Sequence, residues 1–99
     1  MEVEFRDSKL ALIETSRAAE TKLPLSVINS ARRKLFLIRA APDERTMRNW
    51  KSLHYEKMTG ARKGERSIRL NDQWRMSIDL DDSRSPAKVV VLEITNHYA

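Results

Sequence analysis

The sequence contains no cysteine, and several other features that would define a protein class are also missing. Without cysteine, disulfide scaffolds, thiolate zinc sites, iron–sulfur clusters and cysteine nucleophiles are excluded. The two histidines, His54 and His97, have no companion His or Cys to complete a zinc site, so we expect neither a metal ion nor another cofactor. No stretch approaches the ~18–20 apolar residues of a membrane span. The first residues also lack the basic start and apolar run of a signal peptide. These absences favour a soluble cytoplasmic protein with no membrane partner.

Glycine and proline are scarce, with two glycines and three prolines among 99 residues. A chain of this length has room for a single core, so we predict one domain over 1–99. Hydrophobic residues make up 40% of the chain, which is enough for a modest packed interior and argues against disorder.

The N-terminal half has the pattern of two helices, after a short segment, 3–5, that could form a strand. Asp7 and Ser8 could cap a first helix over about 9–20. Pro24 suits the start of a second helix, whose apolar residues recur at helical spacing as far as Ile38. The segment from Pro42 ends this helix and could begin one more short turn.

Strand patterns dominate from residue 53. The runs 66–70 and 74–80 alternate apolar and polar residues around an Asn-Asp-Gln turn, which predicts a β-hairpin. The valine-rich run 88–94 predicts an internal strand covered on both faces, and 53–57 is a plausible further strand. We therefore predict an α+β domain in which two N-terminal helices pack on a small antiparallel sheet.

The net charge of +5 is concentrated between Lys57 and Arg75, where six basic residues face two acidic ones. A basic segment of this kind typically meets a polyanion such as nucleic acid, although a solvated surface is the alternative reading. Arginine outnumbers lysine here, and the planar guanidinium suits bidentate phosphate contact. Two glycines, at 60 and 64, bracket adjacent cations in one loop. The binding candidates are Lys57, Arg62, Lys63, Arg66 and Arg69.

The chain ends with a second group of chemically capable residues, Asn96, His97 and Tyr98. RNA cleavage by the ribose 2′-hydroxyl needs a base for that hydroxyl, an acid for the 5′-oxygen and cations for the phosphate. His97 could transfer a proton, and Tyr98 could stack on a base or donate a hydrogen bond. A lone histidine near a terminus more often has no catalytic role. The basic hairpin favours a catalytic role for His97 and balances that expectation. Arg75 joins the binding candidates as a source of charge stabilisation.

The run from Lys57 to Arg75 resembles the signature of HigB-type toxins in the RelE/ParE superfamily of toxin–antitoxin modules. That signature reads roughly Lys-Leu-Lys-Gly-x-Arg-x-Gly, followed by Ser-Ile-Arg-x-Asn-x-x-Trp-Arg. The order of elements and the final His/Tyr cluster agree with it as well. The resemblance extends over nearly the whole chain, and its specific part lies at 57–75 and 93–98.

This resemblance implies a RelE/ParE-like fold and a metal-independent endoribonuclease that enters the ribosomal A site and cleaves mRNA, thereby inhibiting translation. It also implies neutralisation by a HigA-like antitoxin with a helix-turn-helix domain. The complex would repress its own promoter, so operator DNA is a partner only through the antitoxin.

Two departures from the family pattern leave the catalytic roles open. Family members often end Asp-Tyr-His where this chain has residues 96–98 as Asn-His-Tyr, so the acid and aromatic roles could be exchanged. The family's upstream His aligns with Glu56, and His54 lies on the same strand face if that segment is extended. Either could act as the base, while Arg75 is interpreted as the active-site cation and Trp74 as core.

A second hypothesis is a non-catalytic protein of the same fold that binds the antitoxin with its DNA, or a gyrase-type target. The terminal His and Tyr favour the nuclease, because a gyrase binder needs no proton-transfer group. A free-standing RNA-binding module is weaker still, since six aromatic residues must also supply the core.

Overall fold

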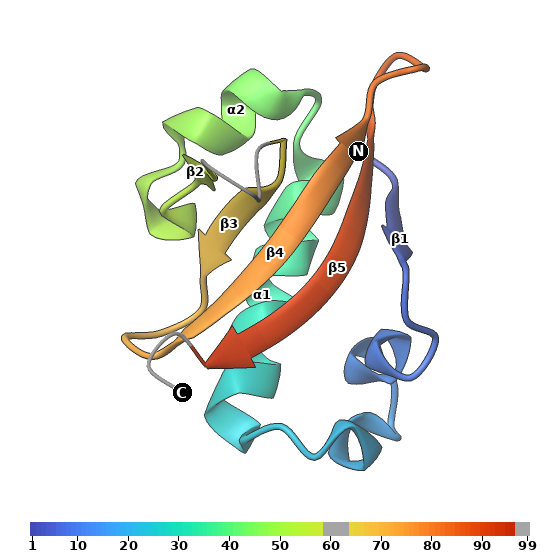
Figure 1. Ribbon diagram of the computed structural model, residues 1–99, viewed down its shortest axis with the longest axis vertical. Coiled ribbons are helices and arrows are strands. Elements are labelled where there is room, and N and C mark those ends of the chain that lie inside the picture. The colour runs from blue at the N-terminus through green and yellow to red at the C-terminus, as the bar shows by residue number, and fades with distance from the viewer. Residues whose placement is uncertain (59–63, 97–99) are drawn as a thin grey trace.

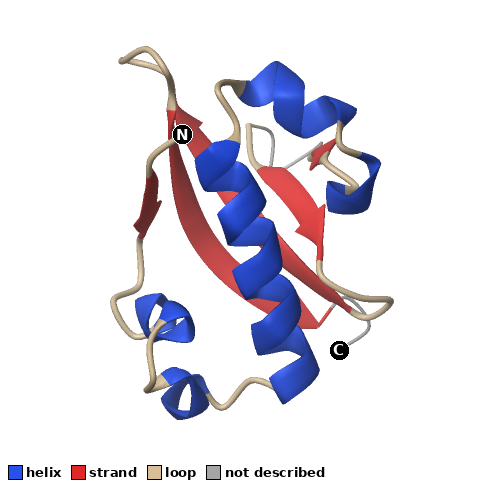
Figure 2. Ribbon diagram, turned by 180° about the vertical axis from the view of Figure 1, so that it is seen from behind, coloured by secondary structure: helices blue, strands red, loops and turns tan. Residues whose placement is uncertain are grey.

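A computed structural model describes residues 1–58 and 64–96, in which helices pack on one face of a twisted five-stranded sheet (Figures 1 and 2). The strand order is β1-β5-β4-β3-β2. Strand β1 runs parallel to β5, and the other neighbouring pairs are antiparallel. The predicted α+β class is confirmed, and the sheet is mixed because β1 joins its edge in parallel. The strands are β1 (Val3–Phe5), β2 (Glu56–Lys57), β3 (Arg66–Arg69), β4 (Trp74–Asp81) and β5 (Lys88–Asn96).

The long helix α1 (Leu25–Ala40) lies across the back of the sheet, as Figure 2 shows. Pro24 stands immediately before its first turn, where a missing N–H costs nothing. The predicted second helix is thus confirmed. Its apolar stripe is buried together with the apolar residues on the facing side of β3, β4 and β5, and this burial supplies most of the stabilisation. The fully buried partners include Val27, Leu35, Ile38, Ile68, Met76, Ile78, Val89 and Val91.

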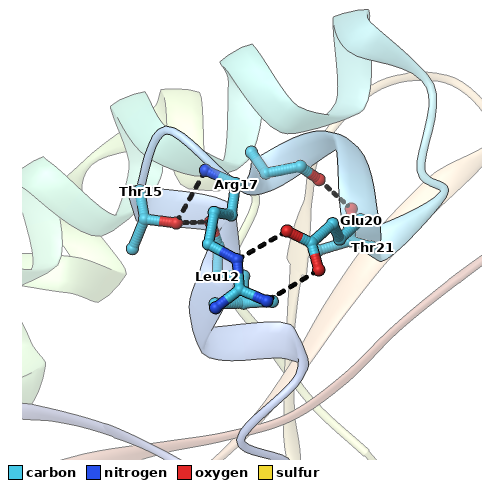
Figure 3. Close-up of polar contacts among 6 residues, drawn as sticks. Leu12, Thr15, Arg17, Glu20 and Thr21 are labelled. Carbon is cyan, nitrogen blue, oxygen red and sulfur yellow. Dashed lines mark hydrogen bonds and ion pairs between the residues drawn. The ribbon is translucent and has the colours of Figure 1, made fainter.

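The predicted first helix over 9–20 is wrong: the segment forms two short 3₁₀ helices, η1 (Leu10–Glu14) and η2 (Ala18–Thr21). Figure 3 shows the polar contacts of Thr15, which lies where η1 ends. Its hydroxyl donates to the Leu12 carbonyl (2.7 Å) and accepts from the Arg17 amide (3.0 Å). A threonine side chain that bonds its own backbone in this way competes with helix continuation.

The valine-rich strand β5 is internal, between β1 and β4, as predicted. The prediction that both of its faces are covered is wrong. Val89 and Val91 are buried on the side of α1, whereas Val90 is only half-buried on the other side. Beyond Val91 the register shifts so that Ser77 pairs with Glu93, which leaves one extra residue in β5 as a β-bulge.

A short helix leads from α1 to the far edge of the sheet. Helix α2 (Glu44–Asn49) begins at Asp43, whose carboxylate accepts from the Thr46 amide (2.9 Å). It is followed by the 3₁₀ helix η3 (Lys51–Leu53), so the predicted strand over 53–57 shortens to the two residues of β2.

Across 1–58 and 64–96, every helix is too short or too polar to cross a membrane.

Candidate nucleic-acid interface

The face of the sheet that α1 leaves open carries the candidate site. In the β3–β4 hairpin, Ser67 pairs with Ser77 and Arg69 with Arg75. Side chains of directly paired residues project from the same face, and successive residues alternate. Because Met76 and Ile68 point into the core under α1, these two pairs point the other way. The hairpin therefore presents two arginines side by side on the open face.

Arg75 lies at the centre of this group. Its Nη1 donates to the Ser67 hydroxyl (3.2 Å) and lies 4.0 Å from Oε2 of Glu56. Glu56 reaches the same face because it pairs with Ser67 in the antiparallel β2–β3 ladder. On the other side, Thr95 of β5 pairs with Arg75. We call these residues the open-face cluster: Glu56, Ser67, Arg69, Arg75 and Thr95.

Arg69 is held by the turn that connects β3 to β4. Its Nη2 forms an ion pair with Asp72, and its Nε donates to the Asn71 carbonyl (3.4 Å). The turn itself is tied to α1, because the buried Ser30 hydroxyl donates to the Leu70 carbonyl (2.6 Å). Like charges directly opposite each other weaken a sheet. Here each arginine has a carboxylate nearby, Asp72 for Arg69 and Glu56 for Arg75, which offsets the repulsion.

Two of the predicted binding residues, Lys57 and Arg66, pair with each other and project from the opposite side of the sheet. Arg66 pairs with Ile78, which faces the core. Its Nε lies 3.2 Å from Oε2 of Glu44, and its Nη1 donates to the Gly64 carbonyl (2.5 Å). Strand alternation therefore places these two binding candidates on the other side of the sheet from Arg69.

The carboxylate of Glu44 is the centre of this second group. It accepts from the half-buried Tyr55 hydroxyl as well as from Arg66. Burial and the hydrogen bond to Glu44 raise the pKa of Tyr55 well above its ordinary value. Burial alone would raise the pKa of Glu44, but the Tyr55 hydrogen bond and the charges of Arg66 and Lys57 outweigh it, so this pKa is lowered. The group fixes the β2–β3 edge that carries Glu56.

His54 does not share the strand face of Glu56. It follows η3 in the left-handed conformation (φ 44°, ψ 52°) and is exposed. The segment is therefore not extended at this residue, as the expectation required. This removes the geometric reason for treating His54 as the base.

Asn96 is the last described residue of β5 and pairs with Trp74. Trp74 is half-buried against the core, in agreement with its predicted role. Asn96 consequently projects from the side of α1, whereas Thr95 projects beside Arg75.

Four predicted site residues, namely Arg62, Lys63, His97 and Tyr98, lie outside the described residues. Within the described part of the chain, His, Asp and Glu form no group of three or more that could hold a metal ion. What the described cluster can do chemically is bind an anion between Arg69 and Arg75, next to the carboxylate of Glu56.

Sequence reasoning missed Ser67 and Thr95 in the cluster, and Glu44 and Tyr55 behind it. Ser67 has the same strand parity as Arg69, so the alternation could have indicated its face. The long-range contact between Tyr55 and Glu44 leaves no comparable signal in a single sequence.

The arrangement of the chain is similar to that of several solved structures. The YoeB/ParE toxin from Agrobacterium tumefaciens matches with a TM-score of 0.64 and 18% identity over 99% of this chain and 100% of that chain. YafQ from E. coli strain BL21(DE3) matches with a TM-score of 0.66 and 11% identity, covering 98% and 93%. The protein HP0894 from Helicobacter pylori matches with a TM-score of 0.52 and 12% identity, covering 99% and 96%.

The fold is therefore that of RelE/ParE-like toxins. Identities this low show the fold alone, because different functions are built on one fold. Comparison with family models gives no match, and neither does comparison with curated protein sequences.

Proposed function

We propose that this chain is the toxin of a type II toxin–antitoxin module and acts as a metal-independent endoribonuclease on ribosome-bound mRNA. The observation that carries the proposal is the open-face cluster, in which Arg69 and Arg75 stand side by side with Glu56 next to Arg75. The fold shared with a YoeB/ParE toxin supports the toxin assignment. The motif between Lys57 and Arg75 supports the HigB type.

The cluster suits the charge demands of RNA cleavage. The 2′-oxygen forms a bond to the adjacent phosphorus while the bond from phosphorus to the 5′-oxygen breaks, leaving a cyclic phosphate and a 5′-hydroxyl. Negative charge accumulates on the non-bridging oxygens of the transition state, where fixed guanidinium groups stabilise it. In this proposal Arg75 and Arg69 bind that phosphate, and the Ser67 hydroxyl restrains the guanidinium of Arg75.

Two groups are needed to move protons. Glu56 is a suitable acceptor for the proton of the 2′-hydroxyl, because it is exposed on the same face as Arg75. His97 is proposed as the acid for the 5′-oxygen, and Tyr98 as a stacking surface for a base, both from the resemblance. Residue 97 follows the end of β5, two positions after the residue that pairs with Arg75.

The partners follow from the same proposal. They are the ribosome with its mRNA and a HigA-like helix-turn-helix antitoxin, with operator DNA bound only through the complex. The adjoining reading frame should then encode such an antitoxin.

The deciding experiment is induction of the chain without its antitoxin, followed by primer extension on a translated reporter and on its start-codon mutant. We expect growth arrest and cleavage of the translated transcript only. Arg75→Ala at matched expression is the control for contaminating nucleases and should cleave neither. Equal cleavage of both transcripts would remove the ribosome from the mechanism.

The second candidate is a non-catalytic protein that only binds its antitoxin complex or a gyrase-type target. One observation favours it: His54, the histidine that the structure describes, is exposed and has a left-handed backbone, so it does not continue the strand that carries Glu56. Growth arrest without cleavage of either transcript would select this candidate.

A further inference from the structure

The strand that carries Glu56 has few contacts of its own. Strand β2 consists of two residues at the edge of the sheet, where β3 is its neighbour. Both of its residues are exposed. Segments with few buried contacts open locally more readily than central strands do. The distance between Glu56 and Arg75 therefore depends on contacts that hold this edge from outside the strand.

One such contact lies immediately before β2, at Tyr55. The ring of Tyr55 is half-buried and packs against the core. Its hydroxyl donates to Oε2 of Glu44 on α2, the helix that lies next to this edge in Figures 1 and 2. Because Tyr55 directly precedes Glu56 in the chain, this hydrogen bond fixes the point at which β2 begins.

The same carboxylate oxygen also holds β3. Arg66 is the first residue of β3, and its Nε donates to Oε2 of Glu44 (3.2 Å). Arg66 also pairs with Lys57 of β2, so both strands of this edge are held by one atom of α2. The side chains of Arg66 and Glu44 are 18% and 24% exposed, so water screens their contact less than it screens a surface ion pair.

The donor and the acceptor in this group keep their roles near neutral pH. Burial and the hydrogen bond to Glu44 raise the pKa of Tyr55, so its hydroxyl stays protonated and donates. Burial acts to raise the pKa of Glu44, but the Tyr55 hydrogen bond and the charge of Arg66 lower it, so this group stays a carboxylate. The group is therefore suited to holding a position rather than to exchanging protons.

We propose that Tyr55 is a positioning residue for Glu56: its hydroxyl, bound to Glu44, holds β2 in place against β3. The carboxylate of Glu56 thereby stays beside Arg75. The inference rests on the proposed function, in which Glu56 accepts the proton of the 2′-hydroxyl. A general base must lie within hydrogen-bond reach of the proton that it removes, and a misplacement of about 1 Å can cost a hundredfold in rate.

Tyr55 acts on the rate of cleavage and not on the binding of the ribosome. Arg66 projects from the side of the sheet opposite the open-face cluster, and Glu44 contacts it there. The influence of Tyr55 on the reaction thus passes through the backbone of β2. The phosphate-binding residues Arg69 and Arg75 belong to β3 and β4, which pair with each other independently of β2.

The test compares Tyr55→Phe with Thr21→Val in the full chain. Tyr55→Phe removes the hydroxyl and keeps the ring in the core. Thr21→Val removes another half-buried hydroxyl, which donates to the Ala18 carbonyl (2.7 Å) in the N-terminal segment. Single-turnover cleavage is measured on programmed ribosomes over a range of protein concentrations. Tyr55→Phe should lower the limiting rate by about tenfold or more and leave the half-saturating concentration unchanged, whereas Thr21→Val should match the parent in both.

A double-mutant cycle separates positioning from a general loss of structure. Glu56→Gln should cost little further rate in the Tyr55→Phe background, because a base that is already misplaced has little left to contribute. Glu44→Ala should lower the rate as Tyr55→Phe does. Glu44→Gln keeps a carbonyl oxygen for the Tyr55 hydroxyl, and should therefore recover part of the rate that Glu44→Ala loses.

Amide hydrogen exchange supplies a readout that does not require catalysis. The Met58 amide donates to the Glu65 carbonyl (2.9 Å), directly after β2 and before β3. Tyr55→Phe should speed the exchange of this amide by about fivefold or more, the effect of one lost hydrogen bond. The amides of β4 should exchange as they do in the parent.

A parental limiting rate in Tyr55→Phe would overturn the positioning role and leave the proposed function intact. Losses that multiply in the double variant would overturn it as well, because Tyr55 would then act independently of Glu56, and so would a parental rate in Glu56→Gln. Parental exchange of the Met58 amide in Tyr55→Phe would show that the hydroxyl does not hold this edge. A parent that cleaves no transcript would remove the proposed function, and the positioning role with it.

Discussion

Glu56 and Arg75 lie on strands separated by β3, yet Oε2 of Glu56 is 4.0 Å from Nη1 of Arg75. This distance is too long for a hydrogen bond, and the carboxylate of Glu56 is 64% exposed, so the pair is loose and screened by water. In the proposed reaction, a substrate phosphate would approach Arg75 without first displacing a tight ion pair. The carboxylate of Glu56 would then lie beside the reacting hydroxyl.

Proton transfer can be assigned by three matched glutamine variants. Glu56→Gln and His97→Gln should each lower cleavage by about a hundredfold or more, the range for loss of a general acid or base. His54→Gln should cleave like the parent, because His54 lies at the end of η3. Single-turnover rates on programmed ribosomes provide the measurement. A parental rate in Glu56→Gln would leave this carboxylate with a purely electrostatic role.

The two arginines of the open face should determine the salt dependence of ribosome binding. Arg69→Ala or Arg75→Ala should each reduce the slope of log K against log salt by about 0.7–1, the value for one phosphate contact. Arg84→Ala is the control. Arg84 lies in the loop between β4 and β5 and forms an ion pair with Glu2. Unchanged slopes in both variants would mean that these arginines do not contact phosphate.

Arg66→Ala should act on stability rather than on binding. It removes the guanidinium beside Glu44, whose side chain is 24% exposed, and leaves that carboxylate partly desolvated. We expect a loss of about 1–3 kcal/mol in the free energy of unfolding. Urea denaturation measures it, with Arg69→Ala as the more exposed counterpart that should cost less than about 1 kcal/mol. The opposite ranking of the two variants would contradict the assignment of Arg66 to the interior side.

Glu44 should contribute to the fall in the free energy of unfolding at acid pH. Because its pKa is lowered in the folded state, the stabilisation is fully present above the ordinary Glu pKa of about 4.3 and is lost as the pH falls through the lower folded value. Glu44→Gln should therefore flatten the decline in stability below about pH 4–5. Thermal unfolding from pH 3 to 7 tests this, and curves of identical shape would contradict it.

The Tyr55 hydroxyl should stay protonated in the folded chain at a pH at which an ordinary tyrosine ionises. Its pKa is raised in the folded state, so the stabilisation is present below the ordinary tyrosine pKa of about 10 and is lost as the pH rises above it. Absorbance titration of the folded chain should show a tyrosine component that ionises only at markedly higher pH. Tyr55→Phe should remove that late component, and its persistence in the variant would assign it elsewhere.

Periodicity predicted most of the architecture because it records burial directly. The helical stripe that ends at Ile38 and the alternation from Trp74 to Leu80 correspond to α1 and β4. The same alternation places Arg66 with Ile68 on the core side, so the position of this cation was contained in the pattern. The net charge of the basic segment does not indicate that its arginines divide between the two faces of the sheet.

Other features depend on interactions that period and propensity do not encode. The break between the two 3₁₀ helices of the N-terminal segment coincides with the hydrogen bonds of one hydroxyl, that of Thr15. His54 has a left-handed backbone, so this candidate base does not lie on the strand that was predicted for it. The neighbourhood of Glu44 and Tyr55 required the tertiary fold, because 11 residues and the whole of η3 separate them.

The parallel pairing of residues 3–5 with residues 89–91 also constrains when this protein can become folded. During synthesis β1 is made more than eighty residues before its neighbour in the sheet, β5. Pairings so distant in sequence form slowly, and they cannot form before the second partner exists. Until β5 has left the ribosome, β4 lacks its main neighbour and α1 has only part of a surface to cover. Nascent chains should therefore lack the native sheet until residues 88–96 have been synthesised and have left the ribosome.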